Sequence, residues 1–472
     1  MKNFFKKIQL FATKLPKKTQ LVILSLAAVL ILALIAVLVI TFVRRRPGDD
    51  EIITLTYANW NLGRYRNDAL ELRMIQSFMD EHPNIRVEID NHIALPWTES
   101  LTIAANQNRL PDVFMLEDIG LKASNGWLMD ITSLIWADLD FFDLTRVVQE
   151  SMRIGNVMYA VPFSQNIHGY FVNIDLLREL GVEPPSFGVP AGGFVEAVRT
   201  ATDLSNNRIG LNQVFSFVEW YPGAINNELG FFAFDGFGFA LNSPYMHEAV
   251  RVASGLFGEG SSFDGVPANV RDAHFPSGYA LGTFRDGQMA FLYGDLWLAN
   301  LMIGQVPFEW EFIGVPGGRS VVTLEALGIS STTNHPEEAY MLARWMGYGT
   351  EGSLRRLEYA RDMGIMPNGL PVAQNRAVLE ELLQIIPVPG LVDVYASMDR
   401  ALIDGLRVLS GYMQARFTAP TGVAVQGSDL SDIGVEQLIR YSITGNTYFP
   451  NHSHVAEEVT RHQLDTALAG FR

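Results

Sequence analysis

Cysteine is absent from all 472 residues of this chain, and lysine is nearly absent from its body. Without cysteine there is no disulfide, no thiolate nucleophile, no cysteine-ligated zinc site and no lipid-modified cysteine. Lys122 is the only lysine after residue 18. A phosphate-binding P-loop needs a lysine directly after its glycines. Because Lys122 stands between Leu121 and Ala123, the sequence excludes an ATPase of this type.

Other catalytic and metal-binding patterns are also missing or weak. Gly236-Phe237-Gly238 lacks the third glycine of a dinucleotide-binding fingerprint, and no Gly-x-Ser-x-Gly elbow is present. His452, His454 and Glu457 are spaced for a metal site, but we favour an exposed polar helix start for them. We therefore expect no catalytic residue, no metal and no cofactor.

The charge is divided very unevenly along the chain. Residues 1–48 hold nine of the 35 lysines and arginines and no acid, which leaves 26 basic residues against 51 acidic ones in the remainder. A body this acidic repels nucleic acid and anionic lipid surfaces. We expect no nucleic-acid partner.

The longest apolar run is Leu21–Val43, which has 23 residues and only Ser25 and Thr41 as polar side chains. As a helix it would be about 34 Å long, enough to cross the hydrocarbon core of a bilayer. The sequence therefore predicts a single-pass membrane anchor. The alternative is a cleaved signal peptide, but the run is long for one and is followed by three arginines rather than a cleavage site.

The flanking charges predict the orientation of this anchor. Six lysines precede the run and three arginines follow it. By the positive-inside rule, residues 1–20 form a cytoplasmic tail. Residues 44–51 are then a linker, and the body lies outside the cytoplasm at the cell membrane.

The body begins with the pattern of a strand, a helix and a second strand. Ile52–Tyr57 is rich in β-branched residues, Asp68–Glu81 has apolar residues three or four apart, and Ile85–Ile89 alternates strictly. This order indicates a βαβ unit with parallel strands. We expect an α/β protein with more than one sheet.

The same reading predicts further strands and a helix along the chain. Pro162–Gly169 is interpreted as a polar, turn-rich crossing between two strands, Met158–Val161 and Tyr170–Val172. The other predicted elements are strands at Val113–Leu116, Val214–Val218, Met289–Leu292 and Phe312–Val315, and a helix at Pro336–Trp345.

Aromatic and polar side chains recur at the predicted strand ends. In open α/β sheets, ligands bind outside the carboxyl ends of strands. Aromatic faces stack on sugar rings, and carboxylates and amides bind neighbouring hydroxyls. Core packing or a solvated helix cap is the alternative for each residue. The candidate ligand-binding residues are Trp60, Asn61, Glu117, Asp118, Trp220, Tyr221, Asp295 and Trp297.

Several blocks in order resemble the family-1 extracellular solute-binding proteins of ABC importers, which include maltose-binding protein and other sugar-binding receptors. The similar blocks are Ile53–Trp60, Met74–Val87, Pro111–Val113, Gly126–Thr132, Tyr159–Pro162, Asn173–Pro185, Phe284–Ala290, Pro336–Ala339 with Trp345, Met366–Pro367 and Thr444–Gly445. The resemblance covers roughly residues 52–472.

This resemblance implies a two-lobed α/β fold of the periplasmic-binding-protein type with a hinge, preceded here by the transmembrane helix. Lobe 1 would comprise residues 52–164 and 318–356, and lobe 2 residues 165–317 and 357–472. The first hinge crossing would include Phe163, Asn166 and His168. Trp60 in lobe 1 and Trp220 in lobe 2 would clamp a ligand between them.

The implied function is that of a monomeric, membrane-anchored receptor. It would capture a neutral saccharide and deliver it to ABC permease subunits, without catalysis. The chain departs from the family at Val172-Asn173-Ile174 and has no clear late cleft aromatic near Thr418–Thr421. A tethered glycoside hydrolase and a ligand-sensing ectodomain remain as alternatives.

Overall fold

The computed structural model of this chain describes residues 52–62, 67–367, 369–425 and 433–471. These residues divide into two compact units, residues 52–53 with 83–86 and residues 54–82 with 87–471. In the small unit, the Ile53 N–H donates to the Asn84 carbonyl at 2.9 Å. The large unit contains every candidate ligand-binding residue.

One mixed sheet of nine strands organises the chain, with the main strand order β2-β1-β3-β10-β6-β8-β7. β1 and β3 are parallel, whereas β10 is antiparallel to both β3 and β6, and β8 is antiparallel to β6. β4 (Arg153–Ile154) and β5 (Val157–Met158) form a separate pair. The strands of the large sheet are β1 (Ile53–Ala58), β2 (Ile85–Ile89), β3 (Val113–Leu116), β6 (Ala160–Asn173), β7 (Ile209–Leu211), β8 (Met289–Asp295), β9 (Trp310–Phe312), β10 (Val321–Ile329) and β11 (Leu402–Ile403).

The interpretation of Pro162–Gly169 as a turn-rich crossing is wrong, because these residues lie inside the continuous strand β6. Pro162, which has no N–H to donate, sits where the register between β6 and β10 shifts. Gly169 lies so close to the Gly314 backbone that a Cβ on it would be 2.5 Å from the Gly314 Cα. A proline at a bulge and a glycine at a close backbone contact are compatible with a strand.

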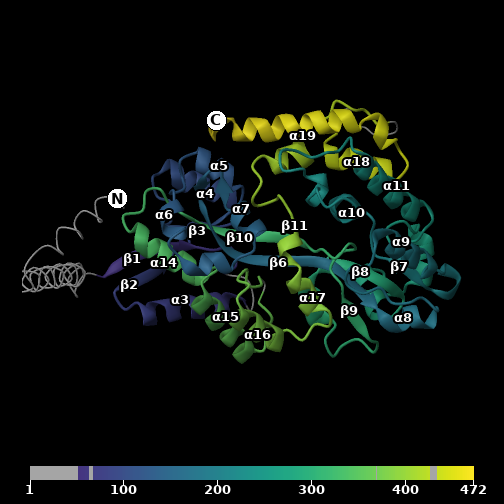
Figure 1. Cartoon of the computed structure of the whole chain (residues 1–472), viewed down its shortest axis with the longest axis horizontal. Helices are drawn as coiled ribbons and strands as arrows, with labels where there is room; N and C mark the ends of the chain where they lie inside the picture. Colours follow the sequence, from purple (N-terminus) through teal and green to yellow (C-terminus); the bar gives the residue numbers. More distant parts are fainter. Residues whose placement is uncertain (1–51, 63–66, 368, 426–432, 472) are drawn as a thin grey trace, which may run out of the picture. The chain divides into compact units, whose positions relative to one another are not determined.

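Helices cover both faces of the sheet. Figure 1 shows α3, α15 and α16 on one side of the strands β1, β3 and β10, and α4, α5 and α7 on the other. The helices in the first half of the chain are α3 (Asn67–Glu81), α4 (Trp97–Asn106), α5 (Ile119–Ser124), α6 (Thr132–Ile135), α7 (Arg146–Ser151), α8 (Ile174–Glu179), α9 (Ala191–Thr200) and α10 (Phe217–Ile225).

The later helices include the C-terminal helix α19, which contacts α5 (Figure 1). These helices are α11 (Pro244–Gly258), α12 (Ala268–His274), α13 (Ala280–Arg285), α14 (Pro336–Met346), α15 (Thr350–Met363), α16 (Arg376–Ile385), α17 (Leu391–Ala396), α18 (Val435–Ile443) and α19 (Ser453–Leu468). The predicted helix Pro336–Trp345 is thus confirmed as α14. The predicted strand at Phe312–Val315 is shifted, because β9 ends at Phe312.

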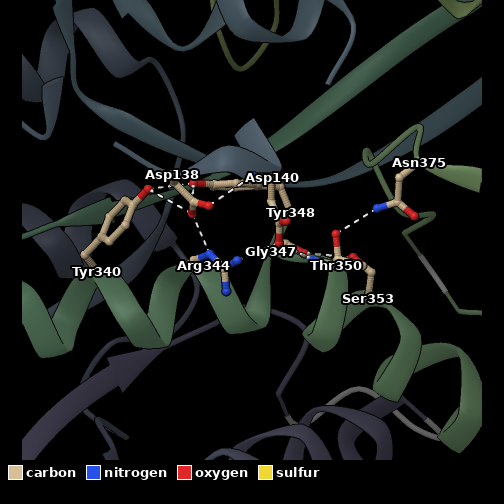
Figure 2. A network of polar contacts seen from close by, with 9 residues as sticks. All are labelled: Asp138, Asp140, Tyr340, Arg344, Gly347, Tyr348, Thr350, Ser353 and Asn375. Carbon is tan, nitrogen blue, oxygen red and sulfur yellow. Dashed lines mark hydrogen bonds and ion pairs between the residues drawn. The ribbon is translucent and has the colours of Figure 1, made fainter. Parts of the chain in front are cut away.

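A polar network joins α14 and the start of α15 to Asp138 on one side and to the N-cap residue of α16 on the other (Figure 2). The Arg344 guanidinium on α14 binds the Asp138 carboxylate at 2.5 Å, and the Tyr348 hydroxyl donates to the same carboxylate at 2.7 Å. At the start of α15, Thr350 accepts a hydrogen bond from the Asn375 amide at 2.7 Å, and Asn375 caps α16. The predicted lobe boundary between residues 356 and 357 falls inside helix α15, and the division into two lobes stays a prediction.

In the part of the chain that the structure describes, no helix is both long enough and apolar enough to span a membrane. The predicted anchor Leu21–Val43, the cytoplasmic tail and the linker lie outside the described residues. They remain predictions from the sequence.

Candidate functional site

A line of polar side chains runs along one face of β6 and β10. Side chains alternate between the faces of a strand, so Ser164, Asn166 and His168 of β6 share a face. In the register of the sheet, Glu325 lies opposite Ser164, and Thr323 lies opposite Asn166. The Ser164 hydroxyl donates to the Glu325 carboxylate at 3.1 Å, and the Thr323 hydroxyl lies 3.4 Å from the His168 Nε2. We call these five residues the polar stripe.

At one end of the polar stripe, three residues from distant parts of the chain meet. Trp60 follows β1, Glu117 follows β3, and Arg407 follows β11. The Arg407 guanidinium forms an ion pair with Glu117, and its central carbon lies 4.7 Å from the centroid of the Trp60 ring. The second Glu117 oxygen accepts a hydrogen bond from the Thr98 hydroxyl at 2.9 Å. The structure thus brings the predicted residues Trp60 and Glu117 together through an arginine that the sequence analysis missed.

A cavity of about 560 Å³ lies beside Trp60, at the carboxyl ends of β1 and β2. Its walls are mostly apolar, and the edge of the Trp60 ring meets the Trp97 ring at a centroid distance of 5.4 Å. An apolar cavity with a few polar groups is typical of a small-molecule site. The lining residues are Asn59, Trp60, Leu62, Leu72, Ile89, Asp90, Asn91, Ile93, Ala94, Leu95 and Trp97.

Glu325 is the one carboxylate of the polar stripe. Burial raises the pKa of Glu325, whereas the charge of Arg407 and hydrogen bonds from the side chains of Ser164 and Trp60 oppose this rise. The carboxyl group is therefore held among donors in a partly desolvated position. Such a group can accept further hydrogen bonds from ligand hydroxyls.

At the other end of the polar stripe lie the predicted residues Asp295 and Trp297. Asp295 pairs with His168 across β6 and β8, and the Asp295 Oδ2 is 3.9 Å from the His168 Nε2. Burial raises the pKa of Asp295, and the nearby His168 opposes the rise. The Trp297 side chain is 41% exposed. Asp295 is the last residue of β8, which is longer than the predicted strand Met289–Leu292, and Trp297 follows it by two residues.

Trp220 and Tyr221 lie in helix α10 and do not follow a strand, so the predicted strand at Val214–Val218 is wrong. The segment that was expected to contain a strand at Val214–Val218 instead starts helix α10 at Phe217. Phe217, Trp220 and Tyr221 are spaced three and four apart, which places them on one helix face. Trp220 has no exposed surface, and its Nε1–H donates to the Tyr170 hydroxyl at 3.1 Å. A side chain without exposed surface has no face to offer a ligand.

The α10 residue that carries a partly accessible polar group is Glu219, one position before Trp220. Burial raises the pKa of Glu219, and the charge and hydrogen bond of Arg416 oppose this rise. The Arg416 guanidinium binds Glu219 at 2.6 Å and Glu436 at 2.8 Å. Asp404 accepts a hydrogen bond from the Thr323 hydroxyl at 3.3 Å, and its negative charge also raises the pKa of Glu219. The Glu219 carboxylate is thus engaged by Arg416.

Asn61 and Asp118 lie near the site but are engaged elsewhere. The Asn61 N–H donates to the Asn59 side chain at 2.8 Å, and Asn61 is buried beside Glu71 and Phe163 rather than lining the cavity. Asp118 caps α5 by accepting the Leu121 N–H at 3.0 Å, and its other oxygen accepts the Gly411 N–H at 3.4 Å. For Asp118, the predicted alternative of a helix cap describes what the structure shows.

Among residues 52–62, 67–367, 369–425 and 433–471, no group of three histidine or acidic side chains is arranged to hold a metal ion. Glu457, which the sequence places near His452 and His454, accepts the Asn242 N–H at 2.9 Å and pairs with Arg461 at 3.0 Å. Its carboxylate is thus used to fix α19.

No family model and no curated protein matches this sequence. Solved structures do resemble it. An ABC substrate-binding protein from Listeria monocytogenes in complex with cycloalternan is 20% identical with a TM-score of 0.62, over 89% of this chain and 100% of its own. The cyclic α-maltosyl-1,6-maltose binding protein from Arthrobacter globiformis is 19% identical with a TM-score of 0.65, over 88% and 100%. A sugar transporter protein from Rhizobium etli, in an open conformation, is 15% identical with a TM-score of 0.65, over 87% and 99%.

The chain has the fold of an ABC solute-binding protein. The α/β fold of the periplasmic-binding-protein type, predicted from the sequence, is confirmed. In this solute-binding-protein fold, β6 and β10 are the strands that carry the polar stripe from the Trp60 end to the Asp295 end.

Sequence reasoning missed several residues of the site. Arg407 and Asp404 follow the two-residue strand β11, which is too short to give a periodic pattern. Glu325 and Thr323 lie in the middle of β10 and not at a strand end. The alternation of Ser164, Asn166 and His168 was the available signal, because it is typical of a half-buried strand.

Proposed function

We propose that this chain is an extracytoplasmic solute-binding receptor that captures a neutral saccharide and delivers it to the permease subunits of an ABC importer. The observation that carries the proposal is the cluster at the Trp60 end of the polar stripe. There an aromatic ring, two carboxylates and a cavity of about 560 Å³ come together. This combination suits the apolar faces and hydroxyl groups of a sugar.

The saccharide assignment is supported by the structural relatives. Two of them are described with cycloalternan and with cyclic α-maltosyl-1,6-maltose, and a third is described as a sugar transporter. Because their identity to this chain is low, they support the class of ligand and not a particular sugar. We expect binding without hydrolysis.

In this proposal, the ligand lies between two lobes that move about a hinge containing Phe163, Asn166 and His168. All three residues lie on β6, the strand that pairs with β10 along one half and with β8 along the other. His168 is the residue at which the pairing changes, since it lies opposite both Val321 and Asp295. This position on the longest strand supports its place in the hinge.

We further propose that the receptor is a monomer tethered to the cell membrane by Leu21–Val43, with its N-terminus in the cytoplasm. The support is the apolar run and the six lysines before it. Mass spectrometry of the membrane fraction should find the chain with residues 21–43 intact. A mature N-terminus beyond residue 43 would contradict the anchor.

The test of the function is a binding screen with the full chain in detergent. Calorimetric titration against neutral saccharides, including cycloalternan and cyclic α-maltosyl-1,6-maltose, should give stoichiometric binding of at least one. Chromatography of the same mixture after incubation should recover that saccharide unchanged. Cleavage of the saccharide would favour the hydrolase alternative, and no binding across the panel would contradict the proposal.

A further inference from the structure

The face of Trp60 is already occupied in this structure. The central carbon of the Arg407 guanidinium lies 4.7 Å from the ring centroid, within the range of a cation–π contact. Trp60 is only 8% exposed. A sugar ring that stacked on this face would need the space that the guanidinium fills.

Arg407 also occupies the neighbouring carboxylate. It forms an ion pair with one oxygen of Glu117, while the other oxygen accepts from Thr98. The same side chain thus engages the two groups, Trp60 and Glu117, that the proposed function assigns to the ligand.

The contact that Arg407 makes here is incomplete. Its Nε is buried and has no hydrogen-bond partner among the described residues. Arginine stays charged at any ordinary pH, so a buried N–H without an acceptor reduces the net stability of this arrangement. The missing hydrogen bond therefore lowers the free-energy cost of moving the guanidinium to water.

The backbone that follows Arg407 is fixed by contacts with α5, whereas the long Arg407 side chain can rotate. The Gly411 N–H donates to Asp118, and a Cβ on Gly120 would lie 1.6 Å from the Ser410 hydroxyl oxygen, which shows how tightly this segment meets α5. Movement of the guanidinium therefore needs rotation of the Arg407 side chain and no displacement of the chain. The side chain is 23% exposed, so it borders solvent.

We infer that Arg407 is an affinity-determining residue of the site: without ligand it covers Trp60 and binds Glu117, and a saccharide has to displace its guanidinium. The inference rests on the proposed function. The apparent affinity for the saccharide is then reduced by the fraction of molecules in which Arg407 occupies the site. The opposite arrangement, in which Arg407 stays and donates to the ligand, predicts the opposite effect of removing it.

The test compares Arg407→Ala and Arg407→Lys with the wild type as full chains in detergent. The probes are cycloalternan and cyclic α-maltosyl-1,6-maltose. Removing a cation–π contact and a partly exposed ion pair should tighten binding about three- to tenfold in Arg407→Ala. Arg407→Lys keeps the charge and loses the planar group, so its affinity should lie between those of the wild type and Arg407→Ala. Arg376→Ala removes an arginine from an exposed pair with Glu380 and should bind like the wild type.

Ionic strength gives a second readout that a merely structural role would not change. Salt screens the Arg407–Glu117 pair, so wild-type affinity for the neutral probe should rise with salt over a range of roughly 0.05 to 0.5 M. Arg407→Ala should not respond. Weaker or unchanged binding by Arg407→Ala would overturn the inference and leave the proposed function intact.

A ligand-free measurement separates the two proposals. Acrylamide quenching of Trp60, taken as the difference between each protein and its Trp60→Phe version, should increase in Arg407→Ala. No increase would overturn the inference whatever the ligand. Binding of a probe by Arg407→Ala alone would support it, and no binding of either probe by any variant would contradict the ligand assignments of both proposals.

Discussion

Trp60 and Trp220, which are predicted from the sequence to clamp one ligand from opposite sides, lie in very different surroundings. Trp60 borders a cavity of about 560 Å³ and contacts Trp97 and Arg407. Trp220 is fully buried, and its ring packs against Tyr170, Phe194, Phe217 and Tyr221. One tryptophan has charged neighbours, and the other has an aromatic core around it.

The difference comes from the element that carries each residue. Trp60 follows a parallel strand at its carboxyl end, where its ring borders a cavity and a charged side chain. Trp220 lies on the buried face of α10, where residues three and four apart face the same neighbours. An aromatic side chain next to a polar one is therefore a useful sign of a site after a parallel strand, but not inside an amphipathic helix.

The largest effect that would test this comparison is the loss of stability in Trp220→Ala. Removing a fully buried tryptophan leaves a cavity in the core and should lower the free energy of unfolding by about 3–5 kcal/mol. Denaturant titration of the ligand-free protein measures this change. Trp136→Ala is the control, because Trp136 is 48% exposed and should lose much less. A Trp220→Ala protein as stable as the wild type would return Trp220 to the list of site candidates.

The next effect is on binding, in Trp60→Ala. If the ring contacts the proposed saccharide, its loss should weaken binding by about 2 kcal/mol, or roughly 30-fold. Calorimetric titration measures the affinity, and thermal unfolding without ligand provides the control. We expect a smaller loss of stability than in Trp220→Ala, since Trp60 borders a cavity. Intact affinity with a large loss of stability would remove Trp60 from the site and make the two tryptophans alike.

The smallest effect concerns the pH dependence of stability at Glu325, the carboxyl group beside Trp60. Burial raises the pKa of Glu325 in the folded state above its unfolded value. The folded protein then binds this proton more tightly, so the contribution is full at pH values below the unfolded pKa and is lost as the pH rises through the folded pKa. Glu325→Gln does not titrate. Its melting temperature relative to the wild type should therefore rise between pH 4 and pH 7.

The control for this measurement is Glu380→Gln, whose carboxylate lies in an exposed pair on α16. Its difference from the wild type over the same pH range is the reference for an exposed carboxyl group. If Glu325→Gln behaves in the same way, the Trp60 region is better solvated than the structure indicates. The difference in burial between the Trp60 region and the Trp220 region would then be greater.

Local patterns predicted much of the fold. The strand, helix and strand that open the body appear as β1, α3 and β2, with bounds that differ from the prediction by at most one residue at any end. β3, β8 and α14 also form where apolar runs and helical spacing indicated them. These elements depend on periodicity and on breaks such as Pro83, which act over a few residues.

The errors occur where neighbours in space overrode local composition. Pro162 and Gly169 favour a turn in isolation, but pairing with β10 and β8 keeps both inside β6. Val214–Val218 has the composition of a strand, but packing of Phe217, Trp220 and Tyr221 in one aromatic core favours a helix from Phe217 on. Propensity is a weak guide when tertiary contacts of this size compete with it.

Strand and helix periods and the order of family-like blocks can be read along the chain, so they were enough to predict the class of fold and several residues that follow strands. The proposed membrane anchor also rests on the sequence alone. Only contacts between distant segments show that Arg407 covers Trp60, that Glu325 and Thr323 continue the polar line of β6, and that Trp220 belongs to the core. These contacts join segments far apart in the chain, and their formation depends on sheet register and packing, which no local pattern encodes.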